Sequence, residues 1–155
     1  MSTATIAPTD VLDSIRELLD QGRVEDALQL INRRGQKSAA IENARGVCLL
    51  RLGKYQQALA TFRDLVFPGG SFGIDPETPT VFQTNYVTAL LTLNNVVVAR
   101  SILDQIEDKH HPAAVRLRSA IGKWKKSLGP LRAMLLLVGA YPDTPVRLDF
   151  PPGDI

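Results

Sequence analysis

The chain has 155 residues, of which 45% are hydrophobic and 22% are charged, and its formal net charge is +2. These values predict one compact domain with a single core and exclude disordered and collagen-like classes. The single cysteine excludes an internal disulfide, and no apolar run is long enough for a signal peptide or a membrane span, so we expect a cytoplasmic protein.

The sequence of the N-terminal part of the chain predicts a flexible segment followed by a pair of helices. Residues 1–8 form the expected flexible segment, and the helices are expected at 10–20 and 24–32. Gly22 lies between the two helices at the predicted turn. After a polar connector, Ser38 is the predicted cap of the next helix, which runs to Leu52.

The second pair of helices carries the clearest pattern in the chain, NARGVCLLRLGKYQQALATF. Gly46 allows two helices to approach closely, and Gly53 ends the first helix at a turn. Tyr55, Ala58 and Phe62 then follow at helical spacing on the second helix. This pattern predicts a helical hairpin whose contact face needs stacked neighbours to bury it.

The remaining two pairs repeat this pattern less closely. Asn94 and Asn95 take the place of the turn glycine in the third pair, and Pro112 and Pro130 lie at the starts of the last two helices. The alanines at the equivalent place in the four pairs are separated by 31, 41 and 34 residues, and they are Ala27, Ala58, Ala99 and Ala133.

The pattern of Gly46, Gly53, Tyr55, Ala58 and Phe62 resembles the tetratricopeptide repeat. The resemblance implies an all-α fold, a right-handed α-solenoid of stacked antiparallel helix pairs over residues 9–140. It also implies that the first helix of each pair lines a concave groove. Of the positions that would form the carboxylate clamp by which some members bind chaperone C-termini, only Arg16 matches, so a chaperone-tail adaptor is disfavoured.

Helical spacing identifies the side chains that would point into such a groove. They are Arg16, Asn43, Val47, Arg51, Thr84, Asn85, Thr88 and Arg118, together with Lys125. Most are polar, and amide or hydroxyl groups three or four residues apart can hydrogen-bond an extended peptide backbone without demanding one sequence. An ordinary solvated helix face is the alternative interpretation of the same residues.

A basic segment near the C-terminus gives the chain a strong charge asymmetry. Between Lys109 and Pro142 there is no acidic residue, and the basic residues are Lys109, Arg116, Arg118, Lys123, Lys125, Lys126 and Arg132. This patch suits an acidic protein segment, nucleic acid phosphate or an anionic membrane surface. Trp124 has two interpretations, a base-stacking side chain or a core residue, and its helical spacing from Leu117 and Ile121 favours the core.

The last predicted helix is apolar nearly all round, from Leu131 to Val138, although the end of a repeat array should be polar. We therefore expect something to cover it. Residues 141–155 form an extended, proline-rich tail, in which Val146, Leu148 and Phe150 alternate. The tail is the favoured cover, and a second copy of the chain or a partner helix is the alternative.

Catalytic and metal-binding patterns are missing from the sequence. The two histidines, His110 and His111, are adjacent, and no zinc-protease, serine-hydrolase or phosphate-loop spacing occurs. We therefore expect no enzyme activity, no cofactor and no metal.

The function predicted on these grounds is an adaptor or scaffold that binds a peptide or protein segment in the groove. The alternatives are a self-associating chain or complex subunit that uses the apolar last helix, and a binder of an anionic partner through residues 109–132, with nucleic acid disfavoured. The long connector at 67–79 is a partner-contacting loop or mere spacing, with contact favoured.

Overall fold

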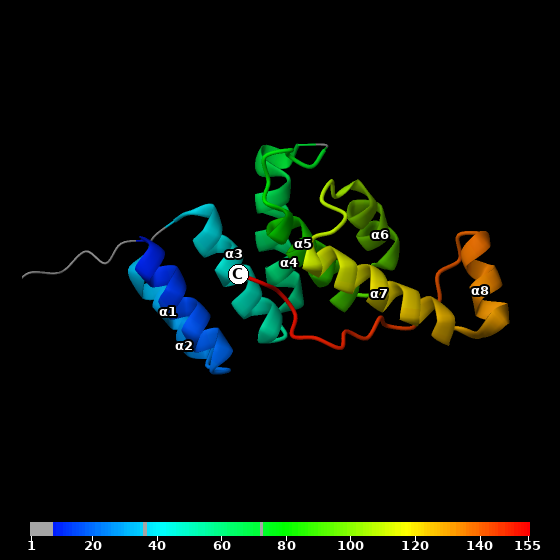
Figure 1. Cartoon of the computed structure of the whole chain (residues 1–155), viewed down its shortest axis with the longest axis horizontal. Coiled ribbons are helices and arrows are strands. Elements are labelled where there is room, and N and C mark those ends of the chain that lie inside the picture. The colour runs from blue at the N-terminus through cyan, green and yellow to red at the C-terminus, as the bar shows by residue number, and fades with distance from the viewer. Residues whose placement is uncertain (1–7, 36, 72) are drawn as a thin grey trace, which may run out of the picture.

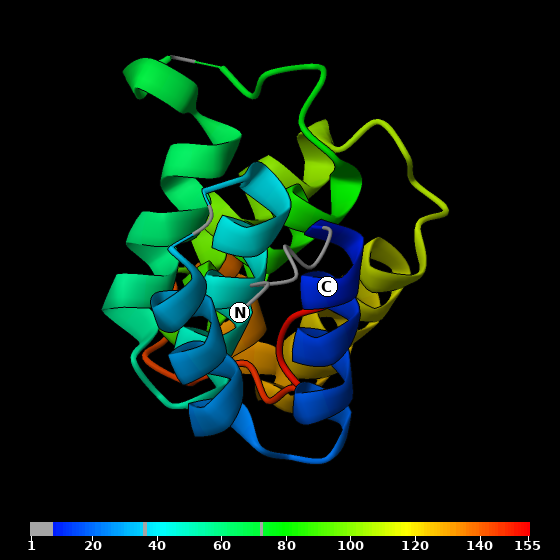
Figure 2. The same ribbon diagram turned by 90° about the vertical axis from the view of Figure 1, so that its left-hand side faces the viewer.

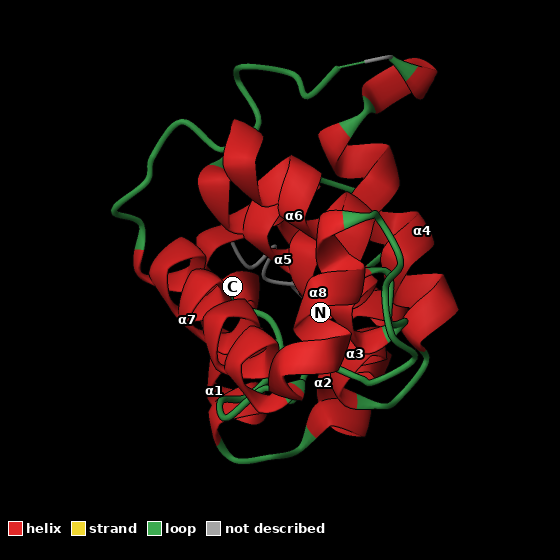
Figure 3. Ribbon diagram, turned by 90° about the vertical axis from the view of Figure 1, so that its right-hand side faces the viewer, coloured by secondary structure: helices red, strands yellow, loops and turns green. Residues whose placement is uncertain are grey.

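A computed structural model describes residues 8–35, 37–71 and 73–155. These residues form helices and loops and no strand (Figures 1 and 3), which confirms the all-α prediction for the described part of the chain. The elements are α1 (Pro8–Asp20), α2 (Val24–Arg34), α3 (Ala39–Arg51), α4 (Tyr55–Val66), the short 3₁₀ helix η1 (Pro68–Gly70), α5 (Thr80–Thr92), α6 (Val96–Gln105), α7 (Pro112–Ser127) and α8 (Gly129–Leu137). The flexible segment predicted at residues 1–8 lies outside the described residues apart from Pro8.

The predicted turn residues end their helices in the expected way. Gly22, Gly53 and Asn94 all have a left-handed backbone, with φ of 73°, 74° and 58°. Such a backbone costs glycine nothing and asparagine little, so the chain can reverse after α1, α3 and α5. The predicted cap of α3 is also present, because the Ser38 hydroxyl accepts a hydrogen bond from the Ile41 N–H at 3.2 Å.

Neighbouring helices pack on one another along the chain. Each helix from α1 to α5 contacts the next, and the odd-numbered helices also contact each other in the order α1, α3, α5 and α7. Figure 1 shows this succession across the molecule. One continuous core therefore runs through the helices, with residues from α1 to α7 in it.

The closest approach between two helices occurs where Gly46 of α3 meets Phe62 of α4. A Cβ atom on Gly46 would lie only 2.4 Å from the Phe62 ring, so a larger residue would push the helices apart. Ala27, Ala58 and Ala99 are also fully buried at helix contacts, whereas the side chain of Ala133 lies outside the described part. Tyr55 differs from the expected contact face, because its place in the first turn of α4 leaves it exposed.

The tail, residues 141–155, folds back over the molecule but does not cover α8. Leu131 and Leu137 of α8 remain 75% and 85% exposed, and Val146 of the tail is buried elsewhere, in the main core. In Figure 1, α8 stands at one end and the tail leads away from it towards α3. The prediction that the tail caps α8 is therefore wrong, because the alternating apolar residues pack against the core instead.

None of the helices formed by the described residues is long and apolar enough to cross a membrane.

Candidate functional site

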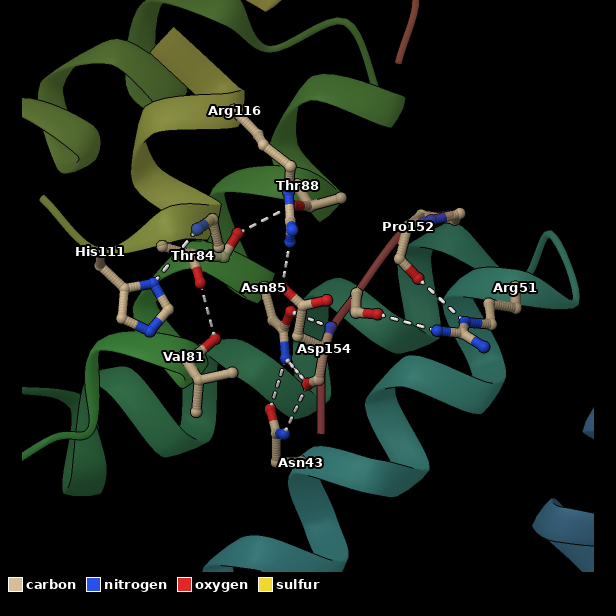
Figure 4. Close-up of polar contacts among 12 residues, drawn as sticks. Asn43, Arg51, Val81, Thr84, Asn85, Thr88, His111, Arg116, Pro152 and Asp154 are labelled. Carbon is tan, nitrogen blue, oxygen red and sulfur yellow. Dashed lines mark hydrogen bonds and ion pairs between the residues drawn. The ribbon is translucent and has the colours of Figure 1, made fainter. Parts of the chain in front are cut away.

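The most distinctive polar site of the described structure is the surface on which the tail lies. We call it the tail face and define it by the side chains of α1, α3, α5 and α7 that contact residues 144–155. Figure 2 shows the tail ending beside α1, and Figure 4 shows its last residues between α3 and α5. Since these helices are far apart in the sequence, their packing alone creates the surface.

At the centre of the tail face, two buried asparagines hold the main chain of Asp154. The Asn85 side chain accepts a hydrogen bond from the Asp154 N–H at 2.9 Å and donates one to the Asp154 carbonyl at 2.8 Å. Asn43 donates to the same carbonyl at 3.2 Å, and Asn85 also donates to the side-chain oxygen Oδ1 of Asn43 at 2.8 Å. Both side chains are almost fully buried, so these bonds satisfy amides that water does not reach.

Next to the asparagines, Arg51 of α3 binds two further carbonyl groups of the tail. Its guanidinium donates to Pro152 at 3.2 Å and to Gly153 at 3.0 Å (Figure 4). A third bond, at 3.4 Å to the carbonyl of Leu19, ties the same side chain to the end of α1. The bond to Leu19 thereby holds the Arg51 guanidinium in place, where it can bind successive carbonyl oxygens of a main chain.

Charged side chains hold the tail at its edges. Arg116 of α7 forms an ion pair with the Asp154 carboxylate at 2.5 Å, and its guanidinium lies 5.3 Å from the centre of the Phe150 ring. Lys123 forms an ion pair with Asp149 at 2.6 Å. The hydrogen bond and charge of Lys123 lower the pKa of the Asp149 carboxyl below its usual range. On α1, Arg16 donates to the carbonyl oxygen of Ile155 at 3.3 Å.

The start of the tail is fixed differently, by burial against α7. The indole N–H of Trp124 donates to the carbonyl of Thr144 at 2.7 Å, and the ring itself is buried. The prediction that Trp124 is a core residue is therefore confirmed. Val146 belongs to the same core, so residues 144–146 anchor the start of the tail by burial, whereas Leu148, Phe150 and Ile155 are only partly buried against the core and the later residues add polar contacts.

Of the residues predicted to line a groove, the structure brings Arg16, Asn43, Val47, Arg51 and Asn85 together under the tail. Thr84, Thr88 and Arg118 use their side chains in other hydrogen bonds. Thr84 and Thr88 are buried and donate their hydroxyl protons to carbonyls within α5, those of Val81 and Thr84, and Arg118 donates to Lys109 and Leu103 near the end of α6. The hydroxyl protons of Thr84 and Thr88 are therefore not available to a peptide backbone.

The predicted basic patch divides in the same way. Arg116 and Lys123 contact acidic side chains of the tail, and Arg132 donates to the Thr144 hydroxyl at 3.5 Å. Lys109 instead binds the Asp104 carbonyl. Lys125 lies with Arg100 and Arg118 around a hollow of about 190 Å³, and Lys126 is exposed.

Two hollows flank the tail where Asp149 bridges to α7. One, of about 420 Å³, is lined by residues that include Trp124, Thr144 and Asp149. The other, of about 380 Å³, is lined by residues that include Arg116, Asp149 and Phe150. The tail therefore does not fill the surface beside α7.

The occupant of the tail face was missed by sequence reasoning, which assigned the tail to α8. A signal was present, because the acidic residues Asp149 and Asp154 follow the basic segment 109–132 in the sequence. They pair with Lys123 and Arg116 of α7, as opposite charges on the tail and on a basic helix favour.

The described residues contain no cluster of three or more histidine, cysteine or acidic side chains suited to a metal ion. Cys48 is buried in α3 as predicted, and burial raises its pKa to about 11, so it remains a thiol at neutral pH.

Comparisons of the chain with family models, with curated proteins and with solved structures found no match.

Proposed function

We propose that this chain is a non-enzymatic protein-interaction module that binds an extended segment of a partner protein on the tail face. We also propose that α1 to α7 form a right-handed solenoid of the tetratricopeptide type. The contacts among the odd-numbered helices and the Gly46–Phe62 approach support the solenoid. In this arrangement the odd-numbered helices line the groove.

The observation that carries the binding proposal is the direction of the polar contacts. Asn43, Arg51 and Asn85 bind N–H and C=O groups of the tail main chain rather than its side chains. Main-chain groups are common to every peptide, so such a surface accepts an extended segment as a class. Buried amides also need partners, so the surface favours being occupied.

The proposal is tested on the full-length chain with Gly153→Val, which loosens the end of the tail. Gly153 has φ of 85°, and a Cβ atom there would lie 3.0 Å from Val47. Valine is therefore strained in both backbone and contact, while the anchor at residues 144–146 remains. A collection of 12-residue, proline-containing peptides of varied sequence is then titrated by fluorescence anisotropy.

We expect some peptides to bind the G153V chain at least about tenfold more tightly than the wild-type chain. Adding Asn85→Ala should weaken this binding strongly, because it removes the two main-chain hydrogen bonds of Asn85 and leaves only those of Asn43 and Arg51. Gly35→Val is the matched control, since Gly35 also has a positive φ but has nothing within 4 Å of its Cβ position. If no peptide binds the loosened chain in an Asn85-dependent way, the proposal is overturned.

A second function is favoured by the exposed surface of α8. Leu131, Met134, Leu137 and Val138 are all well exposed, which suits a chain that associates with its own copy or enters a larger complex. Light scattering of the intact chain tests this. A dimer that becomes a monomer on Leu131→Ser and Leu137→Ser would support it, whereas a monomer throughout the micromolar range would exclude self-association there.

A further inference from the structure

We infer that the tail face selects extended segments in which two prolines precede a glycine and an aspartate, and that the chain's own tail occupies the face as a competing ligand. This inference rests on the proposed function and specifies its ligand. The four selecting positions are those of Pro151, Pro152, Gly153 and Asp154.

The prolines fit a stretch of the tail face that offers donors to the main chain. Proline has no N–H, so Pro151 and Pro152 present only carbonyl oxygens. Arg51 has only donors, and it binds the carbonyls of Pro152 and Gly153. Arg51 offers no acceptor to the N–H group that an ordinary residue would bring in place of Pro152. Pro151 is exposed, so its contribution is the extended backbone that proline favours. Proline also limits the freedom that a segment loses on binding.

The glycine is selected by both shape and backbone. Gly153 is buried and lies against Val47, and a Cβ atom at this position would lie 3.0 and 3.1 Å from the two methyl carbons of Val47. Its φ of 85° is strained for residues with a side chain. Both features come from the path that carries the main chain from the Arg51 contacts to the asparagines, so they apply to any segment that follows the same path.

The aspartate is selected through its side chain, whose position is fixed by the hydrogen bonds to its main chain. Asn43 and Asn85 fix the N–H and C=O of Asp154, which directs its carboxylate towards Arg116 at 2.5 Å (Figure 4). Arg116 also lies over the ring of Phe150, so one guanidinium contacts two side chains of the segment. An uncharged residue at this place would lose the ion pair and keep the main-chain bonds.

The tail is a competitor because its two parts are held by different forces. Residues 144–146 are anchored by Trp124 and by the burial of Val146 in the core. From residue 149 onwards, the tail is held by ion pairs between largely exposed side chains, such as Lys123 and Asp149 at 65% and 64%, and by main-chain hydrogen bonds to Arg51, Asn43 and Asn85. Exposed ion pairs contribute little to stability, and a competing segment would replace the main-chain hydrogen bonds with its own, so it can displace the end of the tail while the start stays in place.

The test uses a synthetic peptide with the sequence of residues 148–155, LDFPPGDI, and the full-length G153V chain. We expect the peptide to bind this chain at least about tenfold more tightly than the wild-type chain, whose own tail occupies the face. The peptide change G153A should weaken binding about tenfold, and D154N about threefold to fivefold. A peptide with both prolines replaced by alanine should also bind more weakly.

A charge exchange checks the register of the bound segment. Adding Arg116→Glu to the G153V chain should weaken its binding of the unmodified peptide. The peptide change D154K should restore binding to that chain. Lys126→Glu is the matched control, because Lys126 is exposed on the same helix and has no contact with the tail among those described. A simple change of net charge would affect both chains alike.

The outcomes separate the two proposals. If varied peptides bind in an Asn85-dependent way but the glycine and aspartate changes have no effect, the ligand inference is overturned and the proposed function stands. Equal affinity of LDFPPGDI for the wild-type and G153V chains would overturn the competing role of the tail. If neither this peptide nor any other binds, both proposals fall.

Discussion

Helix α5 is more polar than helix α8, yet α5 is the buried helix of the two. The buried polar side chains of α5 are Gln83, Thr84, Asn85 and Thr88, whereas Arg132 is the only charged residue among the leucines and methionine of α8. Helix α5 contacts α3, α4, α6 and α7, and α8 contacts α7 at one end of the molecule. Burial therefore follows the number of neighbours and not the composition of the helix.

The difference has a functional consequence. Threonine hydroxyls in α5 are satisfied inside the helix, and Asn85 is satisfied by Asn43 and the tail. A buried amide that needs an outside partner is a binding group, because leaving it unpaired is costly. The exposed leucines of α8 are likewise available to a partner, but through apolar contact.

The largest expected effect is the loss of a leucine in the core of α5. Leu91 is fully buried and Leu137 of α8 is 85% exposed. Leu91→Ala should lower the free energy of unfolding by about 2 to 5 kcal/mol, because it leaves a cavity among packed helices. Leu137→Ala is the control and should change it by less than about 0.5 kcal/mol. Urea denaturation measures both, and similar losses would contradict the comparison.

The dependence of stability on pH tests the burial of Cys48 in α3, the helix that packs against α5. Burial is the main cause that raises the pKa of Cys48 from 9.0 to about 11, although Arg51 and Arg45 partly oppose it. The unfolded thiol loses its proton first as the pH rises. The stability that Cys48 contributes is therefore complete below about pH 9 and is lost between pH 9 and about 11, by about 3 kcal/mol at most.

Cys48→Ala provides the comparison for this titration. Tyr86, whose pKa burial also raises, is present in both chains, so its effect cancels in the difference between them. We expect the stability of the wild-type chain to fall towards that of the variant, or further below it, as the pH rises above 9. A constant difference up to pH 10.5 would indicate that the thiol reaches solvent.

The end of α5 offers a smaller test. Asn94 has φ of 58°, and its side chain donates to the Asp143 carboxylate at 2.8 Å. Asn94→Ala should cost about 1 to 2 kcal/mol, since alanine tolerates this backbone poorly. Asn94→Gly should cost less, because it removes the hydrogen bond but not the backbone freedom. Thermal or urea unfolding distinguishes them, and equal losses would assign the effect to the hydrogen bond.

The smallest effect on stability is expected at the surface of α8. Leu131→Ser together with Leu137→Ser should change the free energy of unfolding by less than about 0.5 kcal/mol, because both side chains are already in water. The same variant should bind less of a dye that recognises apolar surface. A loss of more than about 1 kcal/mol would mean that these leucines are covered in solution.

Much of the local structure was predictable from the sequence. The turns at Gly22, Gly53 and Asn94, the cap at Ser38 and the close approach at Gly46 were all identified. Five of the nine predicted groove residues also contact the tail, because helical spacing fixes which side chains share a face. Thr84 and Thr88 share that spacing, but their hydroxyls bond within α5, a choice that spacing does not reveal.

The position of the tail could not be predicted in the same way. The alternation of Val146, Leu148 and Phe150 suits an apolar cover, and α8 is the nearest apolar surface in the sequence. Arg51, Asn43 and Asn85 are the groups that hold the end of the tail, and they come from helices separated by long stretches of chain. Their arrangement exists only after those helices have packed.

The sequence by itself determined where the helices begin and turn and which side chains share a face, because these depend on residues a few positions apart. The tertiary structure decided that α5 is covered, that α8 is exposed and that the tail lies across α7, α5, α3 and α1. Those outcomes depend on which surfaces meet across the whole chain, where apolar and polar contacts of similar strength compete.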